Sequence, residues 1–90
     1  MYPVRWFQIT PGQYRTLHYL LIHGTCCMGD LATALKVSAP AVAKTARVLE
    51  RKGLIRRRED ASDRRRVLVS LSDAGRKAAE RAQKDRREAS

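Results

Sequence analysis

The chain has 90 residues, of which 19 are lysine or arginine and 9 are aspartate or glutamate, so its formal net charge is +10. This length allows one domain with one modest core, and the charge predicts a polyanionic partner. No apolar run approaches the roughly 20 residues that a membrane span needs, and the first residues lack the apolar centre of a secretory signal. Cys26 and Cys27 are adjacent and provide no disulfide framework. We therefore expect a cytoplasmic protein without a membrane partner.

The first nine residues form an apolar segment, although Pro3 interrupts it. Its side chains carry more apolar surface than a disordered leader needs. They either cap the core of their own domain or contact a second subunit. The apolar residues concerned are Tyr2, Val4, Trp6, Phe7 and Ile9.

Residues 10–38 contain the signals of two helices and a turn. Thr10 and Pro11 are typical of a helix start, and Gly24 is typical of its end. Residues 25–28 then predict a short strand, and a brief helix is expected from Asp30. The turn at Lys36 leads into the next helix with the spacing of a helix-turn-helix. The predicted buried residues are Tyr14, Leu17, Leu20 and Leu21 in the first helix and Leu31, Ala32 and Leu35 in the second.

The next helix, predicted over residues 38–52, has clear ends and two different faces. Ser38 is a preferred N-cap, Pro40 fits the first turn, and Gly53 follows the last turn. The inward stripe is predicted to be Val42, Thr45, Ala46 and Leu49. The opposite face is small at its start and cationic along its length, which suits the DNA major groove but is also compatible with an ordinary solvated face. It carries Pro40, Ala43, Lys44, Arg47 and Arg51.

A β-hairpin is predicted over residues 54–71. The period from Arg66 to Leu71 is that of a strand, and residues 54–58 can pair with it across a loop at 59–63. The two sides of the predicted strand carry Val67, Val69 and Leu71 on one and Arg66, Leu68 and Ser70 on the other. Arginines surround the tip, and 16 of the 19 basic residues lie at or after Lys44. A basic helix followed by an arginine-tipped hairpin predicts a winged helix-turn-helix, a mainly α fold with a small β-hairpin (α+β), whose wing lies at the minor groove.

A polar helix is expected to close the chain, with Ser72 as its cap. Its apolar stripe, Leu71, Ala74, Ala78 and Ala82, is thin. The predicted organisation is an apolar segment over 1–9, a winged helix-turn-helix domain over 10–75 and a polar helix over 76–90.

Four motifs, in this order, resemble the MarR family of winged-helix transcription regulators. They are ITPGQY at 9–14, DLATALKVS at 30–38, ERKGLIRR at 50–57 and, the most specific, DRRRVLVSLSDAG at 63–75. The resemblance implies that Asp63 steadies Arg65, which enters the minor groove. Family members are usually half as long again, with additional helices that build a dimer and frame an effector pocket. The resemblance therefore implies duplex DNA binding more firmly than it implies ligand response.

From these features we expect a sequence-preferring, double-stranded DNA-binding transcription regulator, a repressor associated with the nucleoid. Ser38 and the first amides of its helix should hold a phosphate. Lys44 and Arg47 should reach base edges or flanking phosphates, while Ala39 and Ala43 touch thymine methyls. Around Arg65, the neighbouring Arg64 and Arg66 should lie along the DNA backbone.

Two other classes of function compete with this expectation. An architectural or RNA-binding winged helix would read only charge and shape, and the few hydrogen-bonding side chains over 39–43 favour it. A small nuclease is disfavoured, because no carboxylate cluster could hold a metal. We expect no catalytic residue, cofactor or metal site, and His18 and His23 lack ligands at suitable spacing.

The sequence also carries expectations about assembly and regulation. A single helix reads few base pairs, so we expect a homodimer in which the apolar segment over 1–9 packs against the last helix. A small-molecule effector is neither predicted nor excluded. For Cys26 and Cys27, packing is favoured over redox sensing, because neighbours on a strand point to opposite faces and no cation lies nearby in the sequence.

Overall fold

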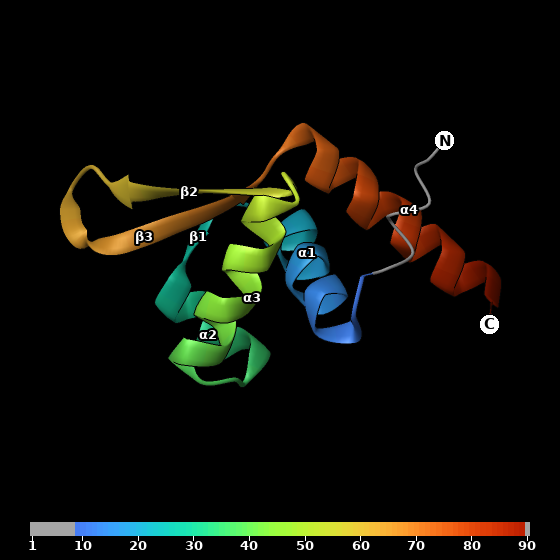
Figure 1. Cartoon of the computed structure of the whole chain (residues 1–90), viewed down its shortest axis with the longest axis horizontal. Coiled ribbons are helices and arrows are strands. Elements are labelled where there is room, and N and C mark those ends of the chain that lie inside the picture. Colours follow the sequence, from blue (N-terminus) through green and yellow to red (C-terminus); the bar gives the residue numbers. More distant parts are fainter. Residues whose placement is uncertain (1–8, 90) are drawn as a thin grey trace.

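The computed structural model describes residues 9–89, with side chains described over 9–85. In this part of the chain four helices accompany a three-stranded antiparallel sheet, confirming the predicted α+β winged helix-turn-helix (Figure 1). The elements are α1 (Pro11–His23), β1 (Cys26–Cys27), α2 (Met28–Leu35), α3 (Ala39–Arg51), β2 (Ile55–Asp60), β3 (Asp63–Leu71) and α4 (Asp73–Ala89).

Side-chain caps define the starts of α1 and α3. Thr10 and Gln13 form a capping box, in which the Gln13 amide donates to Thr10 Oγ1 at 3.1 Å and the Thr10 amide donates to Gln13 Oε1 at 3.3 Å. The Ala41 amide donates to Ser38 Oγ at 3.1 Å. The N-caps predicted for α1 and α3 are therefore confirmed.

Helix α2 begins two residues earlier than predicted. The reason is that Cys27 is its N-cap, and Cys27 Sγ accepts a hydrogen bond from the Asp30 amide at 3.4 Å. The helix ends at Lys36, which adopts the left-handed conformation with φ +59°. This is the turn between the two helices of the helix-turn-helix.

The sheet has the order β1-β3-β2, so β3 is its central strand. The predicted strand at Cys26 and Cys27 is confirmed, and these residues pair with Val69 and Leu68 of β3. The hairpin turn is shorter than the loop predicted over 59–63, because only residues 61 and 62 lie between the strands. Asp60 Oδ1 accepts from the amide and hydroxyl of Ser62, at 2.9 and 2.8 Å, and so closes a tight turn.

Two groups of buried side chains form the interior. The larger is built from α1, α3, α4 and the sheet, and half-buried Ile9 packs against it. The smaller lies between α2 and α3. The larger contains Leu17, Leu20, Ala46, Leu49, Ile55, Val69 and Ala79, and the smaller contains Leu31, Ala32, Leu35 and Val42.

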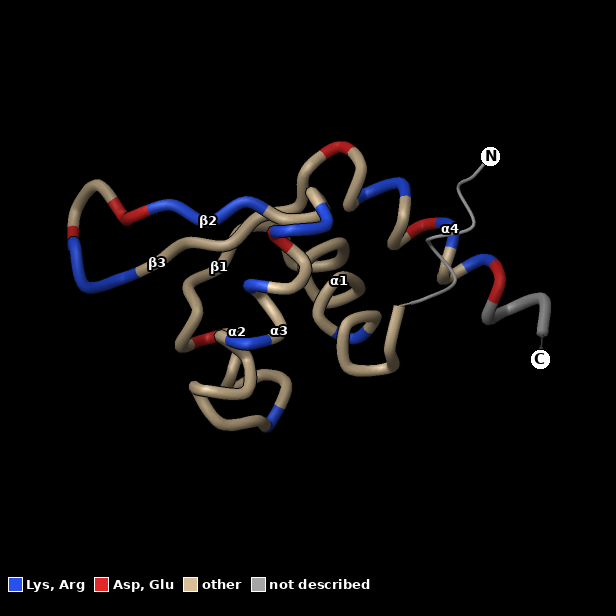
Figure 2. The backbone as a smooth tube through the Cα atoms, in the orientation of Figure 1, with Lys and Arg blue, Asp and Glu red and all other residues tan. Residues whose placement is uncertain are grey.

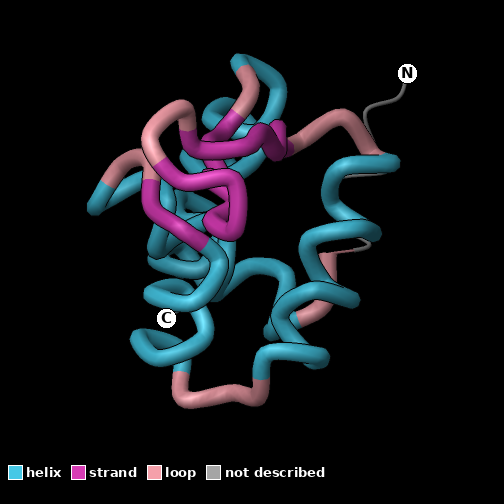
Figure 3. Tube along the Cα trace, turned by 90° about the vertical axis from the view of Figure 1, so that its left-hand side faces the viewer, coloured by secondary structure: helices cyan, strands magenta, loops and turns pink. Residues whose placement is uncertain are grey.

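Helix α4 packs against α1 with a face that agrees with the predicted stripe at Leu71, Ala78 and Ala82 but not at Ala74 (Figure 1). Ala74 is exposed, whereas Gly75, Ala78 and Ala79 are buried and Ala82 is half-buried. The start of α4 decides which side of the helix faces the core. The Ser72 amide donates to the Leu54 carbonyl at 3.1 Å and brings Gly75 against that carbonyl. Viewed along the hairpin, the strands form one small layer on the helical body (Figure 3).

None of the helices within residues 9–89 is both long and apolar enough to cross a membrane.

Candidate nucleic-acid interface

The exposed face of α3 has the predicted character. Ala39 and Pro40 are exposed and Ala43 is half-buried, so the first turns present little bulk. Lys44, Arg47 and Arg51 follow, all exposed. In the described part of the chain no carboxylate forms an ion pair with these three cations. Their charges are therefore available to an external anion.

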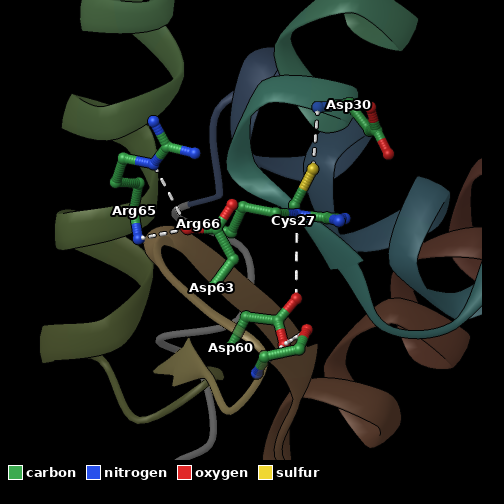
Figure 4. Close-up of polar contacts among 7 residues, drawn as sticks. Cys27, Asp30, Asp60, Asp63, Arg65 and Arg66 are labelled. Atoms are coloured by element: carbon green, nitrogen blue, oxygen red, sulfur yellow. Dashed lines mark hydrogen bonds and ion pairs between the residues drawn. The ribbon is translucent and has the colours of Figure 1, made fainter.

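Asp63 holds the base of the wing arginine Arg65. Its Oδ1 accepts from the Arg65 backbone amide at 3.0 Å and from Arg65 Nε at 3.3 Å (Figure 4). The Arg65 side chain is nevertheless 90% exposed. The carboxylate thus fixes the start of the side chain, while the end of the guanidinium remains open to a ligand. Arg64, beside it, is also exposed.

Arg66 lies in a different environment from its two neighbours. Its Nε lies 3.7 Å from Asp60 Oδ2, and its guanidinium lies against the Cys27 side chain (Figure 4). The neighbouring Cys27 and Asp60 side chains raise the pKa of Arg66. The hydrogen bonds donated by Ser62, with smaller contributions from Arg66 and Arg58, hold the pKa of Asp60 below its ordinary value.

Sequence reasoning missed this cluster, although a signal for it was present. The sequence predicts a short strand over 25–28, and the hairpin side chains that this strand meets follow from its pairing register. The observed register pairs Cys27 with Leu68, and alternation along β3 places Arg66 on the same face as Leu68. The cation that is distant from Cys27 in the sequence is thus close to it in the fold. Cys26 points to the interior, where burial raises the pKa of its thiol.

The basic residues are concentrated on α3, the hairpin and α4. Figure 2 shows lysine and arginine positions along β2, at the start of β3 and along α4. One arginine of β2 joins the wing to α3, since Arg57 Nε lies 2.9 Å from Glu50 Oε1. The helix and the wing are therefore connected directly by an ion pair.

Helix α1 carries an open hollow of about 280 Å³ on the side facing the end of α2. Two ring pairs lie here, Tyr14 with His18 at 5.5 Å and Tyr19 with His23 at 4.1 Å between centroids. His23 Nδ1 is also 3.2 Å from the Tyr19 carbonyl oxygen. The histidines thus make local contacts. Within the described residues, no group of three histidine, cysteine, aspartate or glutamate side chains is placed to hold a metal ion.

Of the residues predicted to contact a second subunit, the structure describes Ile9. Tyr2, Val4, Trp6 and Phe7 lie outside the described residues. Ile9 packs against the larger core group of its own domain.

The order of α2, a left-handed turn, α3 and a two-stranded wing defines a winged helix-turn-helix protein. The sequence pattern of the MarR family matches residues 7–66, and the chain belongs to that family. This confirms the resemblance carried by the four motifs.

Relatives of known or assigned class agree with this membership. The HTH-type transcriptional repressor MdtR of Bacillus subtilis (strain 168) is 37% identical over 67 residues, which cover 74% of this chain and 43% of MdtR. The HTH-type transcriptional regulator YwhA of the same organism, itself uncharacterized, is 36% identical over 64 residues, covering 71% of this chain and 46% of YwhA. The chain therefore spans about half the length of the curated relatives it matches.

Solved structures give the same result for the fold. The S. aureus MepR–DNA complex matches with a TM-score of 0.79 and 41% identity, covering 86% of this chain and 57% of MepR. The YusO protein of Bacillus subtilis matches with a TM-score of 0.86 and 31% identity, covering 94% of this chain and 62% of YusO.

Proposed function

We propose that this chain binds double-stranded DNA with a sequence preference and represses transcription, with α3 in the major groove and the wing at the minor groove. The observation that carries the proposal is the Asp63–Arg65 pair, which fixes an arginine at its base and leaves its end 90% exposed. An arginine held in this way loses little conformational freedom when it enters a narrow groove. The similarity to the MepR–DNA complex and to the repressor MdtR supports this function over RNA binding.

Helix α3 would contact DNA through its exposed face. Lys44 and Arg47 would reach base edges or flanking phosphates, and Arg51 would meet a phosphate. Ala39, Pro40 and Ala43 permit close approach and offer apolar contact to thymine methyls.

The start of α3 offers fewer donors to a phosphate than an ordinary helix start. Pro40 has no amide proton, and the Ala41 amide is engaged by Ser38 Oγ. The Ala39 amide and the Ser38 hydroxyl proton would therefore make the phosphate contact. Arg64 would follow the backbone beside the minor groove, whereas Arg66 is engaged within the protein.

The functional unit we propose is a homodimer acting on chromosomal DNA in the cytoplasm. A single α3 spans too few base pairs to find one site in a genome, so two copies on a two-fold operator would be needed. We retain the segment containing Tyr2, Val4, Trp6 and Phe7 as the proposed contact. The last helix is a poorer partner than its sequence indicated, because Ala78 is buried within the single chain.

Deleting residues 1–7 tests the proposed subunit contact. We expect a folded monomer that retains salt-sensitive, non-specific binding and loses most of its specific affinity, as measured by sedimentation and DNA titration. Unfolding of the truncated protein would instead place these aromatic residues in the core of their own domain.

Competition at fixed salt tests the proposed DNA binding. Specific duplex, random duplex and double-stranded RNA would compete for the wild-type protein and for Lys44→Ala and Arg47→Ala. We expect each substitution to weaken binding to the preferred duplex by about 1–3 kcal/mol. Arg76→Ala, the same charge change on an exposed position of α4, is the matched control and should have less effect. Equal affinity for all three nucleic acids would contradict the proposal.

A further inference from the structure

The wing extends beyond the part of the sheet that the body supports. Strand β1 pairs with β3 only at Cys26↔Val69 and Cys27↔Leu68. Beyond this point the hairpin has two strands and projects away from the helices (Figure 1). Two-stranded hairpins are marginally stable alone in water. The direction of the tip must therefore depend on side-chain contacts near residue 68.

Two such contacts lie on opposite sides of the hairpin. On β2, Arg57 pairs with Glu50 of α3 at 2.9 Å. On β3, Arg66 lies between Asp60 Oδ2, 3.7 Å from its Nε, and the side chain of Cys27 (Figure 4). Cys27 is itself fixed as the N-cap of α2, with the Asp30 amide 3.4 Å from its Sγ. Arg66 thus connects the wing to the first helix of the helix-turn-helix.

We propose that Arg66 is a positioning residue and not a DNA ligand: held by Cys27 and Asp60, it sets the wing relative to the helix-turn-helix and so fixes where Arg65 meets the DNA. This inference rests on the proposed function and names a determinant of its specificity. Adjacent strand residues point to opposite faces, so Arg65 and Arg66 cannot both face the same groove. Only Arg65 is almost fully exposed, at 90% against 50% for Arg66.

The contact of Arg66 with Asp60 and Cys27 should affect the orientation of the wing more than the stability of the fold. Ion pairs between exposed side chains contribute little to the free energy of folding. Removing this contact should therefore leave the domain folded and change the angle of the wing. The effect would appear as a loss of discrimination between DNA sequences, because only a correctly placed Arg65 can read the shape of the groove.

Arg66→Ala and Arg64→Ala form a matched pair, since both remove one arginine from the same strand. Binding to the preferred duplex and to random duplex would be measured across a range of salt concentrations. For Arg64→Ala we expect uniformly weaker binding and a salt slope lower by about one. For Arg66→Ala we expect an unchanged salt slope and a lower specificity ratio, which is the affinity for the preferred duplex divided by that for random duplex. The ratio should fall by roughly threefold to thirtyfold, as expected for mutations that alter the coupling between two sites.

Cys27 provides a second test that changes no arginine. Cys27→Ala should lower the specificity ratio in the same direction as Arg66→Ala, and the double variant should be no worse than the more affected single variant. Cys27→Ser retains a hydrogen-bonding group and should restore most of the ratio. Thermal melting would identify any variant that unfolds. If Cys27→Ala unfolds, the comparison of Arg66→Ala with Arg64→Ala still tests the proposal.

The inference is overturned if Arg66→Ala lowers the salt slope as Arg64→Ala does, which would make Arg66 a phosphate ligand. It is also overturned if folded Cys27→Ala retains the wild-type specificity ratio. Absence of any duplex preference in the wild-type protein would refute the proposed function itself. That result is obtained before any variant is measured, so the two failures are distinguishable.

Discussion

Gly75 occupies a position in α4 where no larger residue fits. A Cβ atom added there would overlap the Leu54 carbonyl oxygen and lie 2.8 Å from the Leu54 carbonyl carbon. Both are backbone atoms, so no side-chain rotation can relieve the overlap. Gly75→Ala therefore requires the start of α4 to move away from the base of the wing.

The expected loss of stability follows from the contacts at this point. Overpacking against a rigid neighbour costs towards the upper end of about 1–3 kcal/mol. The displacement also strains the hydrogen bonds from the Ser72 amide to the Leu54 carbonyl, 3.1 Å, and from Ser72 Oγ to the Gly53 carbonyl, 2.6 Å. These contribute about 1 kcal/mol each, while alanine regains about 1 kcal/mol of helix propensity. We expect a net destabilisation of about 2–4 kcal/mol.

Urea denaturation followed by circular dichroism would measure this loss. Gly29→Ala is the matched control, because Gly29 lies in α2 and a Cβ atom there would meet no atom within 4 Å. The control should be neutral or up to about 1 kcal/mol more stable. If Gly75→Ala were as stable as the control, α4 would not pack against the Leu54 backbone as closely as described.

Three further predictions concern the wing and the turns. Arg65→Ala should weaken specific binding by about 1–3 kcal/mol and relax any preference for A·T-rich flanks; a loss equal on all flanking sequences, measured by DNA titration, would remove the groove-insertion role. Lys36→Gly should stabilise the fold by about 0.5–1 kcal/mol, because Lys36 has φ +59°, a conformation that glycine adopts more easily than lysine. Lys52→Gly, at φ −78°, should instead destabilise the fold. The opposite order of stability in urea denaturation would contradict the left-handed turn. The pKa of Asp60 is lower in the folded than in the unfolded state, chiefly because of the Ser62 hydrogen bonds. Its contribution to folding stability is therefore complete above the unfolded-state pKa and is lost below about pH 4, as the pH falls through the folded-state pKa. Asp60→Asn should therefore be less sensitive to acid than the wild type in thermal melts, and an identical acid dependence would show that the turn contact is absent.

Local chemistry explains why much of the fold was predictable from the sequence. Thr10 and Ser38 cap helices through residues only three positions away, so their roles do not depend on the rest of the chain. The inward stripe of α3 follows from helical spacing alone, and Val42, Ala46 and Leu49 are buried while Thr45 is half-buried. The Asp63–Arg65 contact also joins residues two positions apart.

Two features that the sequence did not reveal, the buried face of α4 and the contact of Cys27 with Arg66, depend on segments that are distant in the chain. The buried face of α4 is set by the approach of Gly75 to Leu54, which no periodicity in α4 reveals, so Ala79 was missed and Ala74 was wrongly placed inside. The contact of Cys27 with Arg66 requires the pairing register of β1 with β3. Side-chain neighbours across a sheet follow only once that register is known.

Selection of bound sequences from a random duplex pool tests the central claim most directly. With the full chain as bait, we predict enrichment of a motif with two half-sites separated by about one helical turn, roughly 34 Å, and with A·T-rich steps where Arg65 enters the minor groove. A bound pool with the same sequence composition as the unbound pool would contradict sequence-preferring DNA recognition by α3 and the wing.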